Sequence, residues 1–235
     1  MEPKLIDADV SHVVLGAGEV GTAVAEVLAS SSTVVLRDIK PIEVRAQVLH
    51  VCIPWQSGFV SSVETAADLH GVDLVIVHST VPVGTCDPRM WVHSPVRGRH
   101  PNLAESLRTF TKHFGGVRAS DAAKLWASIS KTAVHGRAAE TEAGKLWELA
   151  QFGVQVRITQ AIYTWCHERG LDPDVVYRQM AETYNDGYAA LDEHRFIRPV
   201  LDYIPGRIGG HCVTENSYLL DHPISEIVRE GWSDS

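Results

Sequence analysis

A glycine-rich run at residues 16–21, with the sequence GAGEVG, decides which architecture this chain can adopt. The apolar run before it, His12 to Leu15, is typical of a buried strand. After it, apolar residues recur at helical spacing, at Val20, Val24, Val27 and Leu28. A second predicted strand, residues 33–38, follows. This order of strand, glycine turn, helix and strand predicts the start of a parallel sheet with helices on its faces.

Each glycine of the run has a separate use in a dinucleotide-binding turn. Gly16 makes the tight turn, Gly18 lets the backbone approach a pyrophosphate, and Gly21 permits close packing of the helix on the strand. The helix that begins at Glu19 and Val20 presents free N–H groups to the phosphates. The run therefore predicts a nucleotide-binding site at the carboxyl end of the first strand.

The predicted second strand ends in Asp38, 20 residues after Gly18. A carboxylate there accepts hydrogen bonds from an adenosine ribose and repels a 2′-phosphate, which favours NAD over NADP. Arg37 stands beside it, and an arginine suits a 2′-phosphate, so the NADP alternative stays open at this point. A Rossmann-like domain that has no working cofactor site is a second alternative.

Further strands are expected at residues 48–53, 73–78, 90–93 and 113–118, with helices at 58–69 and 121–130. Residues 39–47 alone separate the second strand from the third. A parallel crossover usually takes a dozen residues or more. We therefore expect the crossover helix to be reduced to about one turn.

The second half of the chain is expected to be helical. Apolar residues recur in steps of three and four between residues 138 and 169, which predicts one long amphipathic helix that ends at Gly170. A second helix is expected at 173–183, a turn at 184–187, and a short helix up to Phe196. The predicted fold class is α/β: a Rossmann-like parallel-sheet domain, residues 1–136, precedes a smaller all-helical domain, residues 137–235, with one long central helix.

Composition excludes several classes of function. The formal net charge is −8, from 21 Lys and Arg against 29 Asp and Glu, which argues against nucleic-acid binding. No apolar run approaches a membrane span, and the N-terminus lacks the pattern of a signal peptide. The four cysteines form no CxxC pair, so we expect no metal site and a reducing, cytoplasmic location.

Three more segments, in order, point to one family. They are STVPVGT at residues 79–85, EAGKL at 142–146 and GGHC at 209–212. With the glycine run and Cys52-Ile53-Pro54, they resemble the UDP-glucose/GDP-mannose 6-dehydrogenases over residues 12–220. The resemblance implies an enzyme that uses NAD twice to oxidise the primary alcohol of a sugar to an acid. Ile53, Pro54 and Ser79 are then expected to contact the cofactor.

The resemblance also implies catalytic roles. Cys212 becomes the nucleophile that captures the aldehyde, Lys145 supports the oxyanion or acts as acid or base, and Thr80 handles water and protons. A thiol attacks a carbonyl as the thiolate, so a nearby cation such as Lys145 or His211 would assist it. The alternatives are a structural cysteine in a tight turn and a solvated surface lysine.

The chain departs from the family pattern in several places. The two carboxylates expected after the fifth strand are replaced by Val96 and His100, the asparagine after the lysine by Leu149, and the aspartate after the cysteine by Asn216. These changes remove groups that would hydrolyse a thioester. The replacement loop carries His93, Ser94, Arg97 and His100, which we interpret, with Asn216, as a substrate-binding set that clamps an anion. A solvated basic loop is the alternative.

The leading functional hypothesis is an NAD-dependent oxidoreductase that acts on a hydroxyl of a sugar, nucleoside or related polyol. A redox-neutral enzyme with tightly bound NAD, such as a dehydratase or epimerase, is one alternative. A non-catalytic NAD-binding protein is the other. Few residues follow Cys212, so we expect either a smaller, anionic or polyhydroxylated substrate or a second subunit that completes the site. The long helix predicts a homodimer.

Overall fold

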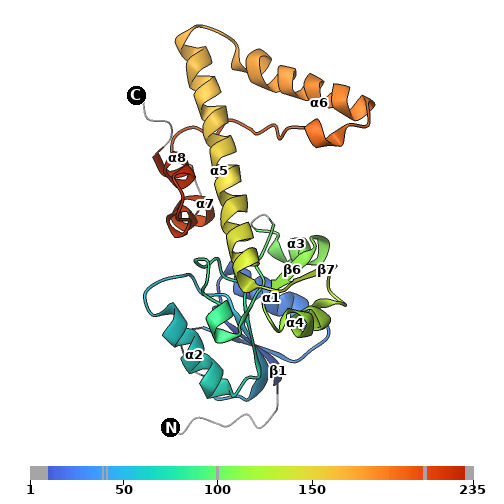
Figure 1. Cartoon of the computed structure of the whole chain (residues 1–235), viewed down its shortest axis with the longest axis vertical. Coiled ribbons are helices and arrows are strands. Elements are labelled where there is room, and N and C mark those ends of the chain that lie inside the picture. The colour runs from blue at the N-terminus through green and yellow to red at the C-terminus, as the bar shows by residue number, and fades with distance from the viewer. Residues whose placement is uncertain (1–9, 39, 41, 99–100, 209–210, 231–235) are drawn as a thin grey trace. The chain divides into compact units, whose positions relative to one another are not determined.

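A computed structural model describes residues 10–38, 40, 42–98, 101–208 and 211–230 (Figure 1). The chain divides into two compact units, residues 1–145 and 146–235. The division falls inside the long helix α5, Ala138–Glu168, whereas the boundary predicted from the sequence, residue 136, lies just before this helix begins. Each unit has its own hydrophobic core.

The first unit is built on a seven-stranded sheet of order β2-β1-β3-β4-β5-β6-β7. Neighbouring strands are parallel except β5 and β6, which are antiparallel and pair at His93 and Gly115. The predicted α/β class with a parallel sheet is confirmed, and the β5–β6 pairing is its one antiparallel exception among the described strands. The strands are β1 Val10–Leu15, β2 Val34–Arg37, β3 Ala46–Val51, β4 Leu74–Val77, β5 Val92–His93, β6 Lys112–Gly115 and β7 Thr132–His135.

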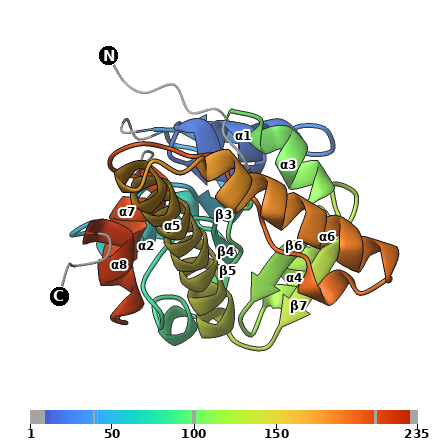
Figure 2. The same cartoon turned by 90° about the horizontal axis from the view of Figure 1, so that it is seen from above.

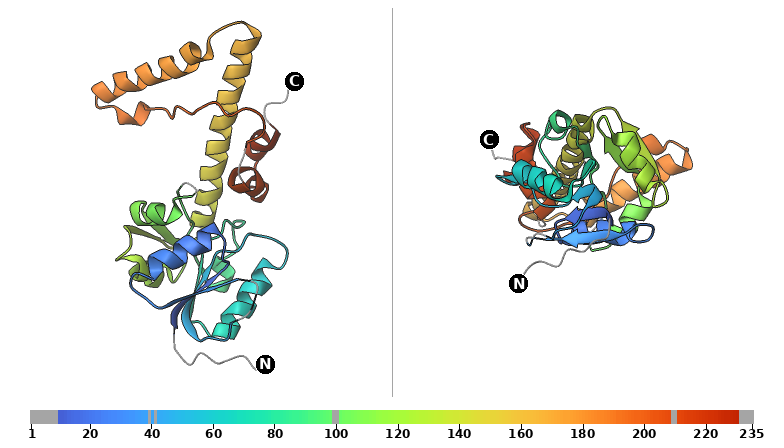
Figure 3. Two further views of the ribbon diagram at one scale, coloured as in Figure 1. Left: turned by 180° about the vertical axis from the view of Figure 1, so that it is seen from behind. Right: turned by 90° about the horizontal axis from the view of Figure 1, so that it is seen from below.

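Helices cover both faces of the sheet, as the alternation of strands and helices predicts (Figure 3). One face packs against α1 Glu19–Leu28, α3 Leu103–Thr109 and α4 Ala119–Trp126, and the other packs against α2 Phe59–His70. Both α3 and β7 were missed in the sequence. Helix α3 buries only Leu103 and Leu107, and β7 has four residues, so neither carries a strong periodic signal.

The connection from β2 to β3 crosses over β1 without a helix among its described residues. Its Val44 is 5% exposed and joins the core that α2 covers. The His70 ring of α2 fixes this connection, because its Nδ1 lies 2.7 Å from the Val44 carbonyl oxygen. The expected shortening of the crossover is confirmed, and a single buried valine fills the space that a helix would otherwise cover.

In the second unit, helices α7 and α8 lie beside α5 (Figure 2). Gly153 makes this packing possible, since a Cβ there would lie 2.7 Å from a methyl carbon of Val228 and 3.0 Å from one of Val213. The described helices of this unit are the part of α5 after Leu146, a π-helical turn Asp174–Gln179, α6 Met180–Ala190, α7 His211–Asn216 and α8 Ile224–Glu230, with short 3₁₀ turns at His194–Phe196 and Ser217–Leu219.

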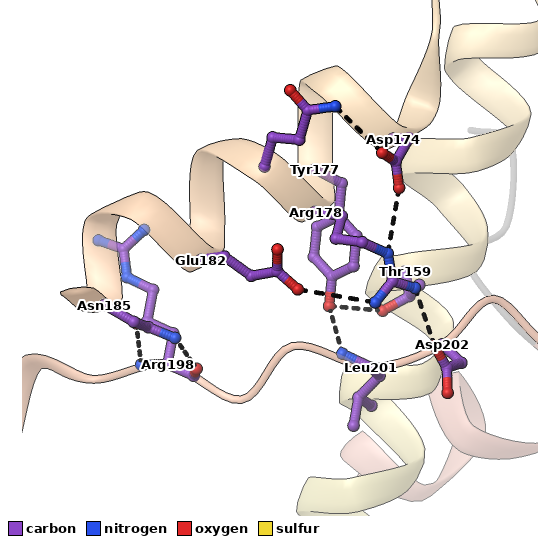
Figure 4. Close-up of polar contacts among 10 residues, drawn as sticks. Thr159, Asp174, Tyr177, Arg178, Glu182, Asn185, Arg198, Leu201 and Asp202 are labelled. Carbon is purple, nitrogen blue, oxygen red and sulfur yellow. Dashed lines mark hydrogen bonds and ion pairs between the residues drawn. The ribbon is translucent and has the colours of Figure 1, made fainter.

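The expected turn at residues 184–187 is wrong, because these residues continue α6. Asn185 favours turns when its side chain competes for nearby backbone groups. Here its amide bonds to a distant residue instead: it donates to the Arg198 carbonyl at 2.8 Å and accepts from the Arg198 N–H at 2.9 Å (Figure 4). The helix therefore keeps its own hydrogen bonds through residue 187.

Polar side chains hold the irregular segment after α6 in place (Figure 4). The Tyr177 hydroxyl accepts from the Leu201 N–H at 2.9 Å, and Thr159 lies 3.3 Å from the same oxygen. The Arg178 guanidinium contacts Asp174, Glu182 and Asp202. This anchoring fixes the segment that leads toward α7.

Candidate nucleotide site and motif residues

The three glycines of the turn meet three different surroundings. Gly16 has φ +104°, and a Cβ there would lie 2.8 Å from the Cys52 carbonyl oxygen. A Cβ on Gly21 would lie 1.7 Å from the Gly16 carbonyl oxygen. A Cβ on Gly18 would meet no described atom within 4 Å. Gly16 and Gly21 are therefore needed by the fold, whereas the open space at Gly18 suits the approach of a ligand.

A cavity of about 360 Å³ lies at the carboxyl end of the first strands and has the size of a small-molecule site. It is lined by residues from four segments of the chain. These residues fit an adenosine ribose and base, since the exposed Asp38 stands where a ribose would need an acceptor. The lining residues are Leu15, Gly16, Arg37, Asp38, Ile53, Ser61, Ser62 and Thr65.

Arg37, which left the choice between NAD and NADP open, is directed to helix α2. Its Nη1 lies 3.0 Å from Nε2 of His70. Burial lowers the pKa of His70, while its backbone contact to Val44 opposes the shift. A neutral His70 that donates from Nδ1 to Val44 accepts from Arg37 at Nε2. The guanidinium is thus partly committed to His70 of α2, which favours the Asp38 interpretation of the site.

The loops after β3 and β4 are joined by Ser79. Its hydroxyl donates to the Ile53 carbonyl oxygen at 2.6 Å, and the residue is buried. Ile53 and Thr80 are half-buried, and Pro54 is exposed. Ser79 therefore positions the loop that carries Ile53 and Pro54. The predicted contacts of these residues with a cofactor stay predictions.

Glu142 of α5 is a site residue whose role the sequence did not reveal. Its side chain is fully buried, and its carboxylate accepts from the N–H groups of Gly84 at 2.6 Å and Cys86 at 2.8 Å. It therefore fixes the end of the STVPVGT segment to α5. Asp87, in the next turn, accepts from the N–H of Ala138 at 2.7 Å and caps the start of the same helix. In the sequence, the one sign of this role is an acidic residue three positions before Lys145.

Lys145 lies one turn after Glu142 on α5 and is half-buried. Its positive charge contributes to lowering the pKa of His93 and of Lys112, after the larger effect of their burial. Lys145 therefore acts electrostatically on the segment after β5 within the first unit. That is a suitable place for a group that assists proton removal from a hydroxyl.

The predicted substrate loop is largely internal. His93 is completely buried, with Nδ1 2.9 Å from the Thr141 hydroxyl and Nε2 3.2 Å from the Ser79 carbonyl oxygen. Burial lowers the pKa of His93 to about 3. Ser94 is buried too, and its hydroxyl has no partner in the described part of the chain. Arg97 is half-buried with its guanidinium over Phe110, and His100 lies outside the described residues.

Cys212 belongs to the second unit, on α7. Of the four cysteines it is the exposed one; Cys86 and Cys166 are buried and Cys52 is intermediate. Asn216 donates to the Cys212 carbonyl oxygen at 2.7 Å, so its amide is used within the helix. His211 begins α7, and Gly209 and Gly210 lie outside the described residues. The assignments of Cys212, His211 and Asn216 stay predictions.

Two further properties bear on the site. In the part of the chain that the structure describes, no group of three or more His, Cys, Asp or Glu side chains is arranged to hold a metal ion. None of the helices in the described ranges combines the length and apolarity needed to cross a bilayer.

Comparison with known proteins identifies the fold. No protein-family model and no curated sequence matches the chain. Among solved structures, UDP-D-ManNAc dehydrogenase from Pyrococcus horikoshii is similar with a TM-score of 0.75 and 21% identity, over 93% of this chain and 67% of that one. UDP-glucose dehydrogenase from Pyrobaculum islandicum gives 0.73 and 18%, over 97% and 68%. The chain thus spans about two thirds of these UDP-sugar dehydrogenases.

A smaller dehydrogenase is similar over almost its whole length. The 3-hydroxyisobutyrate dehydrogenase of Mycobacterium tuberculosis, solved with L-serine, has a TM-score of 0.65 and 15% identity, over 94% of this chain and 91% of that one. At these identities the likeness establishes the fold alone, which this chain shares with these dehydrogenases, including the helical region after the sheet.

Proposed function

We propose that this protein is an NAD-dependent oxidoreductase that acts on a hydroxyl group of a small molecule. The observation that carries the proposal is the glycine turn, in which Gly16 and Gly21 are packed against backbone and only Gly18 faces open space. A turn with a purely structural role has no need for a bare α-carbon at that position. The adjoining cavity with Asp38 supports the same ligand.

The residues that would hold NAD are Gly16, Gly18, Gly21, the first turn of α1 and Asp38. The amides of Glu19 and Val20 would bind the pyrophosphate, and the Asp38 carboxylate would accept from the ribose hydroxyls. When bound, NAD supplies a hydride acceptor. The residues of this chain would position the substrate hydroxyl and provide the route by which its proton leaves.

Lys145 is the group that we propose to assist removal of the hydroxyl proton. Its place on α5, one turn from the buried Glu142, holds its backbone rigidly. Cys212 is the group that we propose to capture or position the carbonyl product, because its thiol is exposed. His211 and Thr80 are proposed to assist. These roles follow the resemblance of the EAGKL, GGHC and STVPVGT segments.

The proposed substrate is a sugar, nucleoside or related polyol. Small β-hydroxy acids form a second candidate class, because the fold matches 91% of the 3-hydroxyisobutyrate dehydrogenase chain. Among the described residues of the loop after β5, Arg97 is the cation that would bind a carboxylate or phosphate of the substrate. A redox-neutral reaction with tightly held NAD remains the alternative mechanism.

The experiment is a substrate screen in which reduced nicotinamide is followed by absorbance and product by mass spectrometry. Net NADH with a polyol or hydroxy acid supports the dehydrogenase. Product without net NADH supports the redox-neutral alternative. NAD binding by calorimetry without turnover leaves a non-catalytic NAD-binding protein. All three outcomes require NAD to bind at the glycine turn. We therefore expect Gly18→Val to lose NAD binding while its circular dichroism spectrum stays unchanged.

Two variants test the catalytic assignments. Lys145→Met and Cys212→Ala are expected to keep NAD affinity and to lose turnover. Glu140→Gln, exposed on the same helix as Lys145, is the control. Full activity in Cys212→Ala would show that this cysteine is structural and takes no part in the chemistry.

A homodimer through α5 is also proposed. Trp147, Phe152 and Trp165 on this helix are 42%, 44% and 47% exposed, more apolar surface than a solvated helix usually carries. Light scattering is expected to give twice the chain mass, and Trp165→Glu is expected to give a monomer.

A further inference from the structure

Three histidines and a lysine form a continuous hydrogen-bonded row inside the first unit. His12 Nδ1 lies 3.0 Å from His50 Nε2, and His50 Nδ1 lies 2.9 Å from His78 Nε2. His78 Nδ1 lies 3.2 Å from Lys112 Nζ. Strand register produces the row. His12 pairs with Val48, two residues before His50 on β3, and His50 pairs with Ile76, two residues before His78, which directly follows β4.

All four side chains of the row are buried, and His50 is the most completely buried. His50 is 0% exposed, while His12 is 4% exposed and Lys112 is 3% exposed. Burial lowers the pKa of His50 and of His78 well below the usual value, and the charge of Lys112 lowers both further. Both rings are therefore neutral, with one N–H each. A neutral imidazole between two partners must donate on one side and accept on the other.

Lys112 has three partners for its three protons. Its Nζ lies 2.6 Å from the Ser94 carbonyl oxygen, 2.9 Å from the Pro95 carbonyl oxygen and 3.2 Å from His78 Nδ1. The Trp126 ring lies 5.3 Å away on another side. No carboxylate is among its partners in the described ranges. Burial lowers the pKa of Lys112 to about 7; Cys52 opposes this shift and Lys145 adds to it.

The charge of Lys112 sets the direction of every hydrogen bond in the row. When it is charged, it donates to His78 Nδ1, so all three histidines carry their proton on Nε2. When it is neutral, its lone pair accepts from His78 Nδ1–H, and all three carry it on Nδ1. In both states the two remaining Lys112 protons are donated to Ser94 and Pro95. His78 Nδ1 also lies 2.9 Å from the Ser94 carbonyl oxygen, to which it donates in the neutral state, so this contact favours the Nδ1–H form.

We propose that His12, His50 and His78 are the proton path of Lys112, and that Lys112 is a positioning residue for the segment after β5. The lysine gives a proton to His78 Nδ1; His78 passes its Nε2 proton to His50 Nδ1, and His50 passes its own to His12 Nδ1. The Nε2 proton of His12 leaves to water. One proton and one positive charge leave the interior, no group changes oxidation state, and the reverse sequence restores the start.

The consequence falls on residues 94–98, the candidate substrate loop. The charged lysine makes charge-assisted hydrogen bonds to two successive carbonyls, and these are about twice as strong as the neutral ones that replace them. The hydrogen bonds from Lys112 to the Ser94 and Pro95 carbonyls therefore weaken when Lys112 loses its proton. His93, whose ring contacts Ser79 and Thr141, faces the same charge and precedes this segment.

The test is histidine NMR on the 15N-labelled chain, which needs neither NAD nor substrate and so stands apart from the proposed function. Long-range 1H–15N spectra distinguish the Nδ1–H and Nε2–H tautomers. Between pH 5.5 and 9, we expect His12, His50 and His78 to switch from Nε2–H to Nδ1–H together, at the pH where Lys112 loses its proton. Tautomers that differ among the three rings, or that switch at separate pH values, would overturn the relay.

Lys112→Met is the matched variant, because it keeps the aliphatic chain over Trp126 and removes the ammonium. His78 Nδ1–H then has only the Ser94 carbonyl, 2.9 Å away, so the row is expected to stay in the Nδ1–H form at every pH. The stacked pair His113 and His135, whose rings lie 2.9 Å apart at Nδ1 and Nε2, is the internal control, and its spectra should be the same in the wild type and in Lys112→Met. A pH switch that survives in Lys112→Met would assign it to another group and refute the proposal; the wild-type titration decides alone if this variant does not fold.

Discussion

The α-carbon of Gly21 stands against the Gly16 carbonyl oxygen so closely that an added Cβ would lie 1.7 Å from that oxygen. Gly21→Ala must therefore push α1 away from the turn. We expect a loss of about 1–3 kcal/mol in the free energy of unfolding, which is the usual cost of overpacking. Urea denaturation measures it. Gly18→Ala is the control, because its Cβ meets open space. Equal losses in both variants would contradict the different roles of the two glycines.

Glu142→Gln is expected to destabilise the protein by about 1–3 kcal/mol. The glutamine amide turns one N–H group toward the Gly84 or Cys86 N–H, so one buried donor loses its acceptor. Thermal unfolding measures the loss. Glu140→Gln on the exposed side of the same helix should change little, and an equal effect of both substitutions would mean that the loop does not depend on this carboxylate.

Acid is expected to destabilise the first unit. Burial lowers the pKa of His50, His78 and His93 below 6.5. Below that pH the unfolded chain binds protons that the folded chain does not, so stability falls as pH falls, by up to about 1.4 kcal/mol per pH unit for each histidine. Urea unfolding at pH 7 and 5.5 measures the slope.

His93→Gln should reduce this slope, because it removes one of the three groups. His194→Gln, with an exposed side chain, should leave the slope unchanged. Lys112 acts in the same sense at higher pH: between about 7 and 10.5 the unfolded state binds the extra proton, so its contribution to stability rises with pH.

Thiol labelling is expected to distinguish the four cysteines. Cys212 is exposed, Cys86 and Cys166 are buried, and burial raises the pKa of Cys52 to about 12. A disulfide reagent should therefore modify one thiol rapidly in the folded protein and all four after denaturation. Cys212→Ser should remove the rapid reaction. Rapid labelling that persists in this variant would show that another cysteine opens to solvent.

Local patterns predicted most of the fold. The glycine run, the strand that ends near Asp38 and the helix at 138–168 rest on spacing within a single segment, and they appear where expected. The turn at 184–187 was wrong because Asn185 bonds to Arg198, which lies 13 residues away. A partner outside the segment leaves no local pattern.

The buried polar groups of the first unit could not be predicted for the same reason. His12 and His50 come from two strands and His78 directly follows a third, and only the register of the sheet aligns them. Glu142 likewise meets Gly84 and Cys86 from 56 residues or more away in the chain. The sequence indicates the segments of this site, and tertiary pairing decides which side chains face one another.

The short crossover, which has no helix among its described residues, also affects how the chain can fold. His12 of β1 pairs with Val48 of β3, so two central strands join after a short excursion of the chain. Loop-closure entropy rises with the logarithm of loop length, and each doubling costs about 0.6 kcal/mol. The unit β1-α1-β2-β3 therefore has a low entropic cost of assembly. A crossover with a full helix would make the pairing of β1 with β3 more costly in entropy.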